Sequence, residues 1–94
     1  MHYISTSKQT TPQSLSAAIS AGLASDGGLF VPEHLPVIDF SFTWSELSYP
    51  DFACRLLEPF FMTDNLAKSL PHFCQSAFHF PVPMKQLDNN TFVL

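Results

Sequence analysis

The sequence predicts a small α+β domain, in which short helices pack on small β elements and a β-hairpin ends the chain. The length of 94 residues suits one small domain or a piece of a larger protein. Segments with apolar residues at helical spacing alternate with short β-favouring runs, which is the pattern of a mixed fold. No stretch approaches the ~18 uninterrupted apolar residues of a membrane-spanning helix, and no apolar signal-peptide core occurs near Met1.

The composition indicates that part of the apolar surface needs an outside partner. Hydrophobic residues make up 46% of the chain and include ten Phe, whereas charged residues make up only 13%. That charged share is about half of the usual ~25%. A chain of this size buries only about 60–70% of the surface that its unfolded form exposes. We therefore expect a domain that rests against another protein surface.

The charge pattern argues against a nucleic-acid partner. The net charge is −4, and the basic residues stand singly along the chain: Lys8, Arg55, Lys68 and Lys85. Binding to phosphate backbones needs several clustered cations. We therefore expect neither nucleic acid nor, without an apolar span, a membrane as partner.

Two short strands are predicted near the N-terminus. Tyr3–Thr6 is a β-favouring run, and Leu29–Val31 is a second one. Pro32 follows the second run and should stop it, because proline has no N–H to donate to a ladder.

A helix over residues 15–24 is predicted between these strands. Ser14 is a candidate N-cap, and the apolar positions that follow recur on one helical face: Leu15, Ala18, Ile19, Gly22 and Leu23. We expect Leu15, Ile19 and Leu23 to be buried against the two strands. Asp26-Gly27-Gly28 should end the helix, because glycine takes the left-handed cap conformation without steric penalty.

The middle of the sequence predicts capped helices. Thr43–Glu46 matches a capping box and predicts a single helical turn. Ser48–Asp51 is a second capping box, in which Pro50 suits the first turn. The helix that follows carries a wide apolar stripe as far as Phe61, and Pro59 should kink its last turn.

The last third of the sequence predicts short helices and then a hairpin. Asn65–Leu70 reads as a short helix that Pro71 interrupts, and residues 72–78 resume it. Residues 83–94 predict a β-hairpin, with Asn89-Asn90 in a two-residue type I′ turn, because asparagine tolerates positive φ. Its second strand would be cut off at the apolar C-terminus.

The candidate metal and thiol groups point to structural roles. The histidines, His2, His34, His72 and His79, lack the tight paired spacing of zinc ligands, so no metal site is expected. Cys54 and Cys74 lie among apolar neighbours and are interpreted as buried free thiols in a reducing cytosol. A disulfide or a metal pair remains the alternative for these two residues.

No catalytic group is indicated by the residues themselves. Gly27-Gly28 follows a helix and precedes a strand, so a cap is favoured over a phosphate cradle. Lys8, Lys68 and Lys85 lie in polar or short segments, unlike the desolvated lysines that form Schiff bases. The serines have no nucleophile elbow around them.

Two stretches nevertheless resemble a known family. One is Tyr3–Thr6 followed by A-I-S-A-G-L-A-S-D-G-G-L-F-V-P-E at residues 18–33. The other combines Ala77-Phe78, Phe80–Pro83 and, later, Leu87-Asp88 with Phe92–Leu94. In this order and spacing they resemble the N-terminal region of threonine synthase of the bacterial and fungal type.

The resemblance implies a fold-type II enzyme that uses pyridoxal phosphate to convert O-phospho-L-homoserine and water to L-threonine and phosphate. Residues 1–80 would be the N-terminal domain, and residues 81–94 a hairpin that leads into the absent cofactor-binding domain. The family's cofactor lysine lies in an E-L-F-H-G-P-T-x-A-F-K-D segment that would begin after Leu94. The resemblance therefore implies no catalytic, cofactor-binding or metal-binding residue in this chain, which should bind no pyridoxal phosphate and be inactive alone.

Two functions follow as hypotheses. The chain is either the structural N-terminal part of such an enzyme, packed on its cofactor domains in the cytoplasm, or a free-standing interaction module of shared ancestry. In the first case the fragment alone should self-associate, through Thr91–Leu94 and the helix that carries Phe52 and Phe60.

Overall fold

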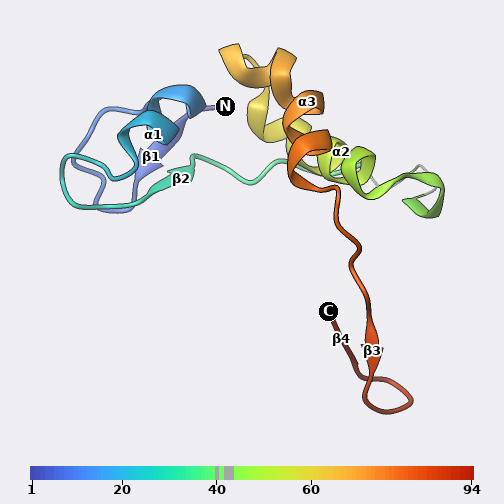
Figure 1. Cartoon of the computed structure of the whole chain (residues 1–94). Coiled ribbons are helices and arrows are strands. Elements are labelled where there is room, and N and C mark those ends of the chain that lie inside the picture. Colours follow the sequence, from blue (N-terminus) through green and yellow to red (C-terminus); the bar gives the residue numbers. More distant parts are fainter. Residues whose placement is uncertain (40, 42–43) are drawn as a thin grey trace.

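A computed structural model describes residues 1–39, 41 and 44–94 of the chain (Figure 1). It has three α-helices, two 3-10 helices and two small antiparallel sheets within these residues, which confirms the α+β class. The elements in order are β1 (Tyr3–Ser5), α1 (Leu15–Ala21), β2 (Phe30–Pro32), η1 (Trp44–Glu46), α2 (Tyr49–Phe61), η2 (Asn65–Ser69), α3 (Leu70–Ala77), β3 (Lys85–Gln86) and β4 (Phe92–Val93).

The first sheet joins β1 to β2 as the sequence predicts. The strands pair antiparallel, with Tyr3 opposite Pro32 and Ser5 opposite Phe30. Pro32 lies inside the strand, and the next residue still donates its N–H to the His2 carbonyl at 2.9 Å. The proline therefore does not stop the pairing, because its missing N–H is not needed at this edge.

Helix α1 begins where predicted but ends earlier. The Ser14 hydroxyl caps it by accepting the Ala17 N–H at 3.2 Å. The helix ends at Ala21, because Gly22 takes a φ of 72°. The expected end at Asp26-Gly27-Gly28 is therefore wrong, although Gly27 does have a positive φ, of 82°, in the turn before β2.

The predicted buried face of α1 is also only partly right. Leu15 and Ala18 form a small core with Tyr3, whereas Ile19 and Leu23 are about 60% exposed. A helix of seven residues on a two-stranded sheet makes contact over a single turn. Leu23 lies beyond the helix end, so it does not share the face that the spacing assigned to it.

Helix α2 has the predicted N-terminus. The Ser48 hydroxyl accepts the Asp51 N–H at 3.3 Å, and proline occupies the first turn. Pro59 lies inside the helix, and the kink expected there stays a prediction. The cap expected for η1, Thr43, lies outside the described residues.

Helix α3 starts at Leu70, with Pro71 in its first turn. The prediction that Pro71 interrupts a helix is wrong, because a proline in the first turn has no hydrogen bond to lose. Helix α3 packs on α2 around Ala53, Leu70 and Cys74, which form the second core. A tyrosine links the two cores, since the Tyr3 hydroxyl donates to the Phe60 carbonyl at 2.9 Å.

The chain leaves α3 as an extended segment that ends in the second sheet (Figure 1). Strands β3 and β4 pair antiparallel over two residues each, with Gln86 opposite Phe92. The two-residue type I′ turn is wrong: neither asparagine has positive φ, and the connection is longer. The Asp88 carboxylate instead accepts the Asn90 N–H at 2.9 Å, which makes a local side-chain turn.

Candidate docking surface

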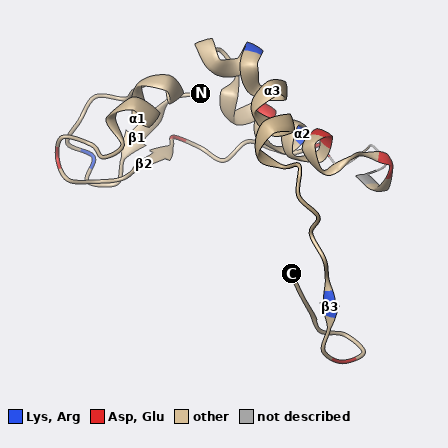
Figure 2. Ribbon diagram, in the orientation of Figure 1, with Lys and Arg blue, Asp and Glu red and all other residues tan. Residues whose placement is uncertain are grey.

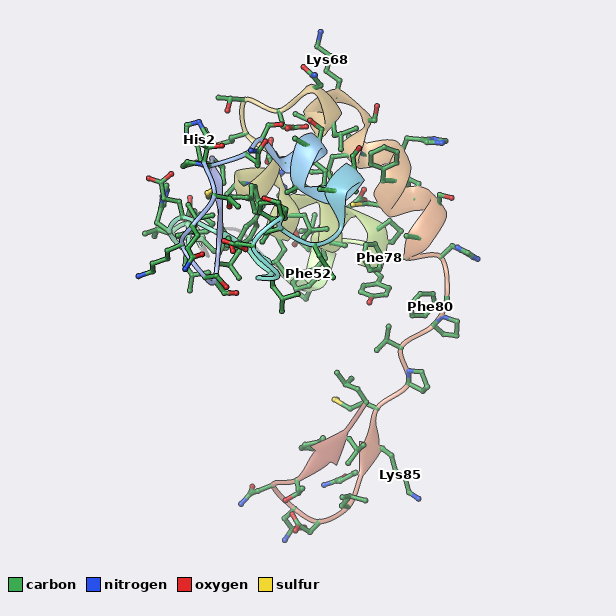
Figure 3. The ribbon with its side chains drawn as sticks, turned by 90° about the vertical axis from the view of Figure 1, so that its left-hand side faces the viewer. His2, Phe52, Lys68, Phe78, Phe80 and Lys85 are labelled. Carbon is green, nitrogen blue, oxygen red and sulfur yellow. The ribbon has the colours of Figure 1, made fainter. Side chains whose placement is uncertain are left out.

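Three aromatic rings meet where the chain leaves α3. The Tyr49 ring lies edge-on to Phe78 and to Phe80, with ring centroids 5.3 and 5.6 Å apart. Figure 3 shows Phe78 and Phe80 at this point, between the helices and the extended segment. Edge-to-face pairs of this kind stabilise a structure beyond their buried area. Phe52 on α2 lines one hollow together with Tyr49 and Phe80. We call Tyr49, Phe52, Phe78 and Phe80 the aromatic patch.

A hollow of about 630 Å³ opens beside the aromatic patch. Its lining residues have apolar or aromatic side chains: Leu47, Tyr49, Phe52, Phe80, Pro81, Val82 and Leu94. Among the described residues, no charged side chain lines it, so its chemistry suits a mainly apolar protein surface.

Residues 79–94, here called the arm, extend the same apolar surface. Every residue of the arm is exposed, including the large side chains Phe80, Val82, Met84, Leu87, Phe92, Val93 and Leu94. A two-stranded hairpin is at best marginally stable by itself in water. The charged residues are scattered along the chain (Figure 2), and the arm contains two of them, Lys85 and Asp88.

The chain as a whole exposes more surface than a compact protein of its mass. It exposes 7012 Å², whereas a compact monomer of 10.5 kDa exposes about 5,400 Å². The radius of gyration is 16.4 Å, against ~12 Å for a compact chain of this length. The excess of roughly 1,600 Å² is about twice what one partner contributes to a standard protein interface.

His2 and His79 each interact with a different local partner. His2 pairs with Glu33 at 3.6 Å, and the His79 ring Nδ1 is 2.7 Å from the Ser76 carbonyl oxygen. Among the described residues, no group of three or more His, Cys, Asp or Glu side chains could hold a metal ion.

The residues that could hold pyridoxal phosphate do not fit that cofactor. Lys8, Lys68 and Lys85 are all exposed, and none lines a hollow where an imine would be shielded from water. The amides of the glycine turn are already used: Gly27 donates to the Ala24 carbonyl and Gly28 to the Asp26 carboxylate, each at 2.9 Å. No N–H of this pair is left for a phosphate.

Two aspartates hold loops through hydrogen bonds that the sequence pattern does not predict. Asp26 accepts the hydroxyl of the fully buried Ser5 at 2.7 Å, and this bond, followed by the Gly28 N–H, lowers the pKa of Asp26. Asp64 accepts the Ser16 N–H at 3.0 Å and so ties α1 to η2; this bond and the Leu66 N–H lower its pKa. Two sequence features could have indicated these roles: Asp26 directly precedes Gly27-Gly28, and Asp64 directly precedes the helical residues Asn65–Ser69.

The structure is a small α+β domain that leaves many large apolar side chains exposed. A family model described as "Threonine synthase N terminus" matches residues 2–78. The chain therefore belongs to the family of threonine synthase N-terminal domains. Among the described residues, no helix combines the length and apolarity that crossing a bilayer requires.

Curated relatives agree with this assignment. The chain is 38% identical to a threonine synthase from Pseudomonas aeruginosa, in an alignment that covers all of this chain and 22% of that protein. It is 30% identical to a threonine synthase from Schizosaccharomyces pombe, in an alignment that covers 98% of this chain and 20% of that protein. A "Threonine synthase-like 2" protein from Homo sapiens is 39% identical over 72% of this chain and 14% of that protein. The chain thus spans about a fifth of the length of the first two. No solved structure matches it significantly.

Proposed function

We propose that this chain is the structural N-terminal part of a threonine synthase, and that the aromatic patch and the arm pack on the cofactor-binding part of that enzyme. The observation that carries the proposal is the excess exposed surface of roughly 1,600 Å², which is the scale of an obligate interface. The large apolar side chains exposed along the arm belong to this surface, and contiguous exposed apolar surface on a protein marks an interaction site.

The parent enzyme would use pyridoxal phosphate to convert O-phospho-L-homoserine and water to L-threonine and phosphate, in the cytoplasm and on a fold-type II scaffold. Residues 1–80 would form its N-terminal domain, and residues 81–94 the hairpin that joins the cofactor domain. The exposed lysines and the occupied glycine-turn amides support a division of labour, in which the rest of the enzyme supplies the cofactor site and this domain supplies packing.

The test combines the chain with the remainder of a relative. The Pseudomonas aeruginosa threonine synthase is produced without its matching N-terminal fifth, and this chain is added as a separate polypeptide. We expect a stoichiometric complex by calorimetry and recovery of threonine formation, while the chain alone forms none. If the remainder precipitates, co-expression of the two pieces and co-purification replaces mixing.

A matched pair of variants locates the surface. Phe80→Ser, in the aromatic patch, should weaken the complex by about tenfold or more, because aromatic anchors dominate interface energetics. Leu35 is 80% exposed, against 50% for Phe80, and lies outside the patch and the arm, so Leu35→Ser should bind like the parent chain. Failure of the chain to bind the remainder, or equal binding by both variants, would favour a free-standing interaction module.

The proposal also predicts self-association of the chain when it is alone. Thr91–Leu94 is exposed, and Phe52 and Phe60 on α2 are only half-buried. Sedimentation velocity over a hundredfold range of concentration should show dimers or larger species. A monomer at every concentration, with no binding of a hydrophobic dye, would contradict this.

A further inference from the structure

The core between α2 and α3 contains both cysteines of the chain. Cys74 on α3 is 1% exposed, and Cys54 on α2 packs against the small core that contains Cys74. Both thiols are free, and Cys54 contributes to the raised pKa of Cys74. A disulfide between them would link the two packed helices across 20 positions of sequence.

One of the two thiols is accessible from solvent. Cys54 is half-buried and lines a hollow of about 580 Å³ between α2 and the start of α3, together with Leu47, Asp51, Arg55, Glu58, Ala67, Leu70 and Pro71. This hollow is distinct from the one beside the aromatic patch, with which it shares only Leu47. A small polar oxidant can therefore reach Cys54 without unfolding the core, whereas Cys74 lies behind it.

We propose that Cys54 and Cys74 are a redox modification site, in which hydrogen peroxide converts the two thiols to a reversible disulfide that links α2 to α3. The Cys54 sulfur attacks one peroxide oxygen, the O–O bond breaks, and water leaves with a sulfenic acid on Cys54. The Cys74 sulfur then attacks the Cys54 sulfur, the S–O bond breaks, and a second water leaves as the S–S bond forms. Peroxide is reduced by two electrons and the thiol pair is oxidised by two.

The roles of the two cysteines follow from their surroundings. Burial, and then the neighbouring Cys54, raises the pKa of Cys74, so this thiol stays protonated and gives its proton to the hydroxyl that leaves as water. Cys54, at the hollow, is the thiol that meets the oxidant. A dithiol reductant reverses the bond by exchange at the exposed Cys54 sulfur.

The test uses the native full chain treated with a small excess of hydrogen peroxide and then analysed under non-reducing conditions. We expect a loss of about 2 Da from the intact mass, a Cys54–Cys74 cross-linked peptide, and a melting temperature higher by roughly 10 °C. Dithiothreitol should restore the original mass and melting temperature.

Two variants separate the roles of the thiols. Cys54→Ser should form neither a disulfide nor a sulfenic acid, since Cys74 is inaccessible to oxidant. Cys74→Ala, chosen to keep the core apolar, should accumulate a dimedone-trappable sulfenic acid at Cys54. Circular dichroism of each variant confirms that it is folded.

Three results would overturn the proposal. One is a native chain that keeps both thiols under peroxide and reacts only when urea is present. Another is a disulfide that links two chains, which a mass of twice the monomer and a dependence on concentration would reveal. The third is sulfenic acid on Cys74 in the Cys54→Ser variant, which would reverse the assigned order.

Discussion

Residues 1–78, here called the body, and the arm, residues 79–94, differ in where their apolar side chains lie. The body contains two small cores, one around Tyr3, Leu15 and Ala18 and the other around Ala53, Leu70 and Cys74. Large apolar residues make up a comparable proportion of the arm, but the arm buries none of them. The family match, over residues 2–78, covers the body.

The two regions are therefore stabilised in different ways. Burial of apolar surface contributes about 25 cal/mol per Å², so the body draws its stability from its own cores. The arm gains nothing of this kind within the chain, and its short ladder is open to water on both faces. Substitutions should therefore change folding in the body and association in the arm.

The largest effect should come from the core between α2 and α3. Leu70 is 3% exposed, so Leu70→Ala should lower the free energy of unfolding by about 2–5 kcal/mol. The same change in the arm, Leu87→Ala, should stay within about 0.5 kcal/mol. Urea unfolding followed by circular dichroism measures both. Equal losses at the two positions would remove the distinction between body and arm.

The glycine turn of the body should show the next largest effect. A methyl group on Gly28 would collide with the buried Ser5 hydroxyl and crowd the Ser7 nitrogen at 3.0 Å, so Gly28→Ala should cost about 1–3 kcal/mol. Gly27→Ala meets no atom within 4 Å but keeps a φ of 82°, and should cost about 1 kcal/mol. A Gly27→Ala variant less stable than Gly28→Ala would show that the packing around Ser5 is loose.

A smaller difference in stability is expected between the loss of a helix cap in the body and the loss of a side-chain turn in the arm. Ser14→Ala removes the hydroxyl that accepts the Ala17 N–H and should cost about 1 kcal/mol. Asp88→Ala removes the similar bond to the Asn90 N–H, yet the thermal midpoint of the body should not change. A shift of that midpoint by Asp88→Ala would mean that the arm folds together with the body.

The smallest effect should be the dependence of stability on acid. Hydrogen bonds from Ser16 and Leu66 place the pKa of Asp64 below its unfolded value of about 3.9. The carboxylate therefore stabilises the fold above about pH 4, and this contribution is lost as pH falls through the lower, folded pKa. Asp64→Asn should make the acid limb of a stability–pH curve for the body less steep. The Asn90 N–H also lowers the pKa of Asp88, but this bond lies within the arm, so Asp88→Asn should leave the acid limb of the body unchanged. An unaltered limb in the Asp64 variant would contradict the assignment.

The local features of the fold could be predicted from the sequence. Ser14 and Ser48 cap their helices because a cap is a bond between a side chain and a backbone N–H three residues away. The end of α1 could not be predicted in this way, since Gly22 and Gly27 are equally able to take positive φ. The choice between them depends on Asp26, whose carboxylate ties the turn to Ser5 across 21 positions.

The sequence predicts that an exposed apolar surface exists, but not where on the molecule it lies. The ten Phe residues and the 13% share of charged residues predict more apolar surface than one small domain can bury. The meeting of Tyr49 with Phe78 and Phe80 depends on how α2 packs on α3, and no local pattern encodes that packing. The placement of Cys54 and Cys74 at one core arises from the same packing.

Hydrogen exchange of the chain, alone and in complex with the truncated Pseudomonas enzyme, shows whether the aromatic patch and the arm dock on the rest of the enzyme. Alone, the amides of α2 and α3 should be protected, while those of β3 and β4 exchange almost as fast as in an unfolded peptide. In the complex, the amides of the arm should become protected to about the level of the body. Slow exchange in the arm of the free chain, or no gain in the complex, would contradict the claim that this surface docks on the rest of a threonine synthase.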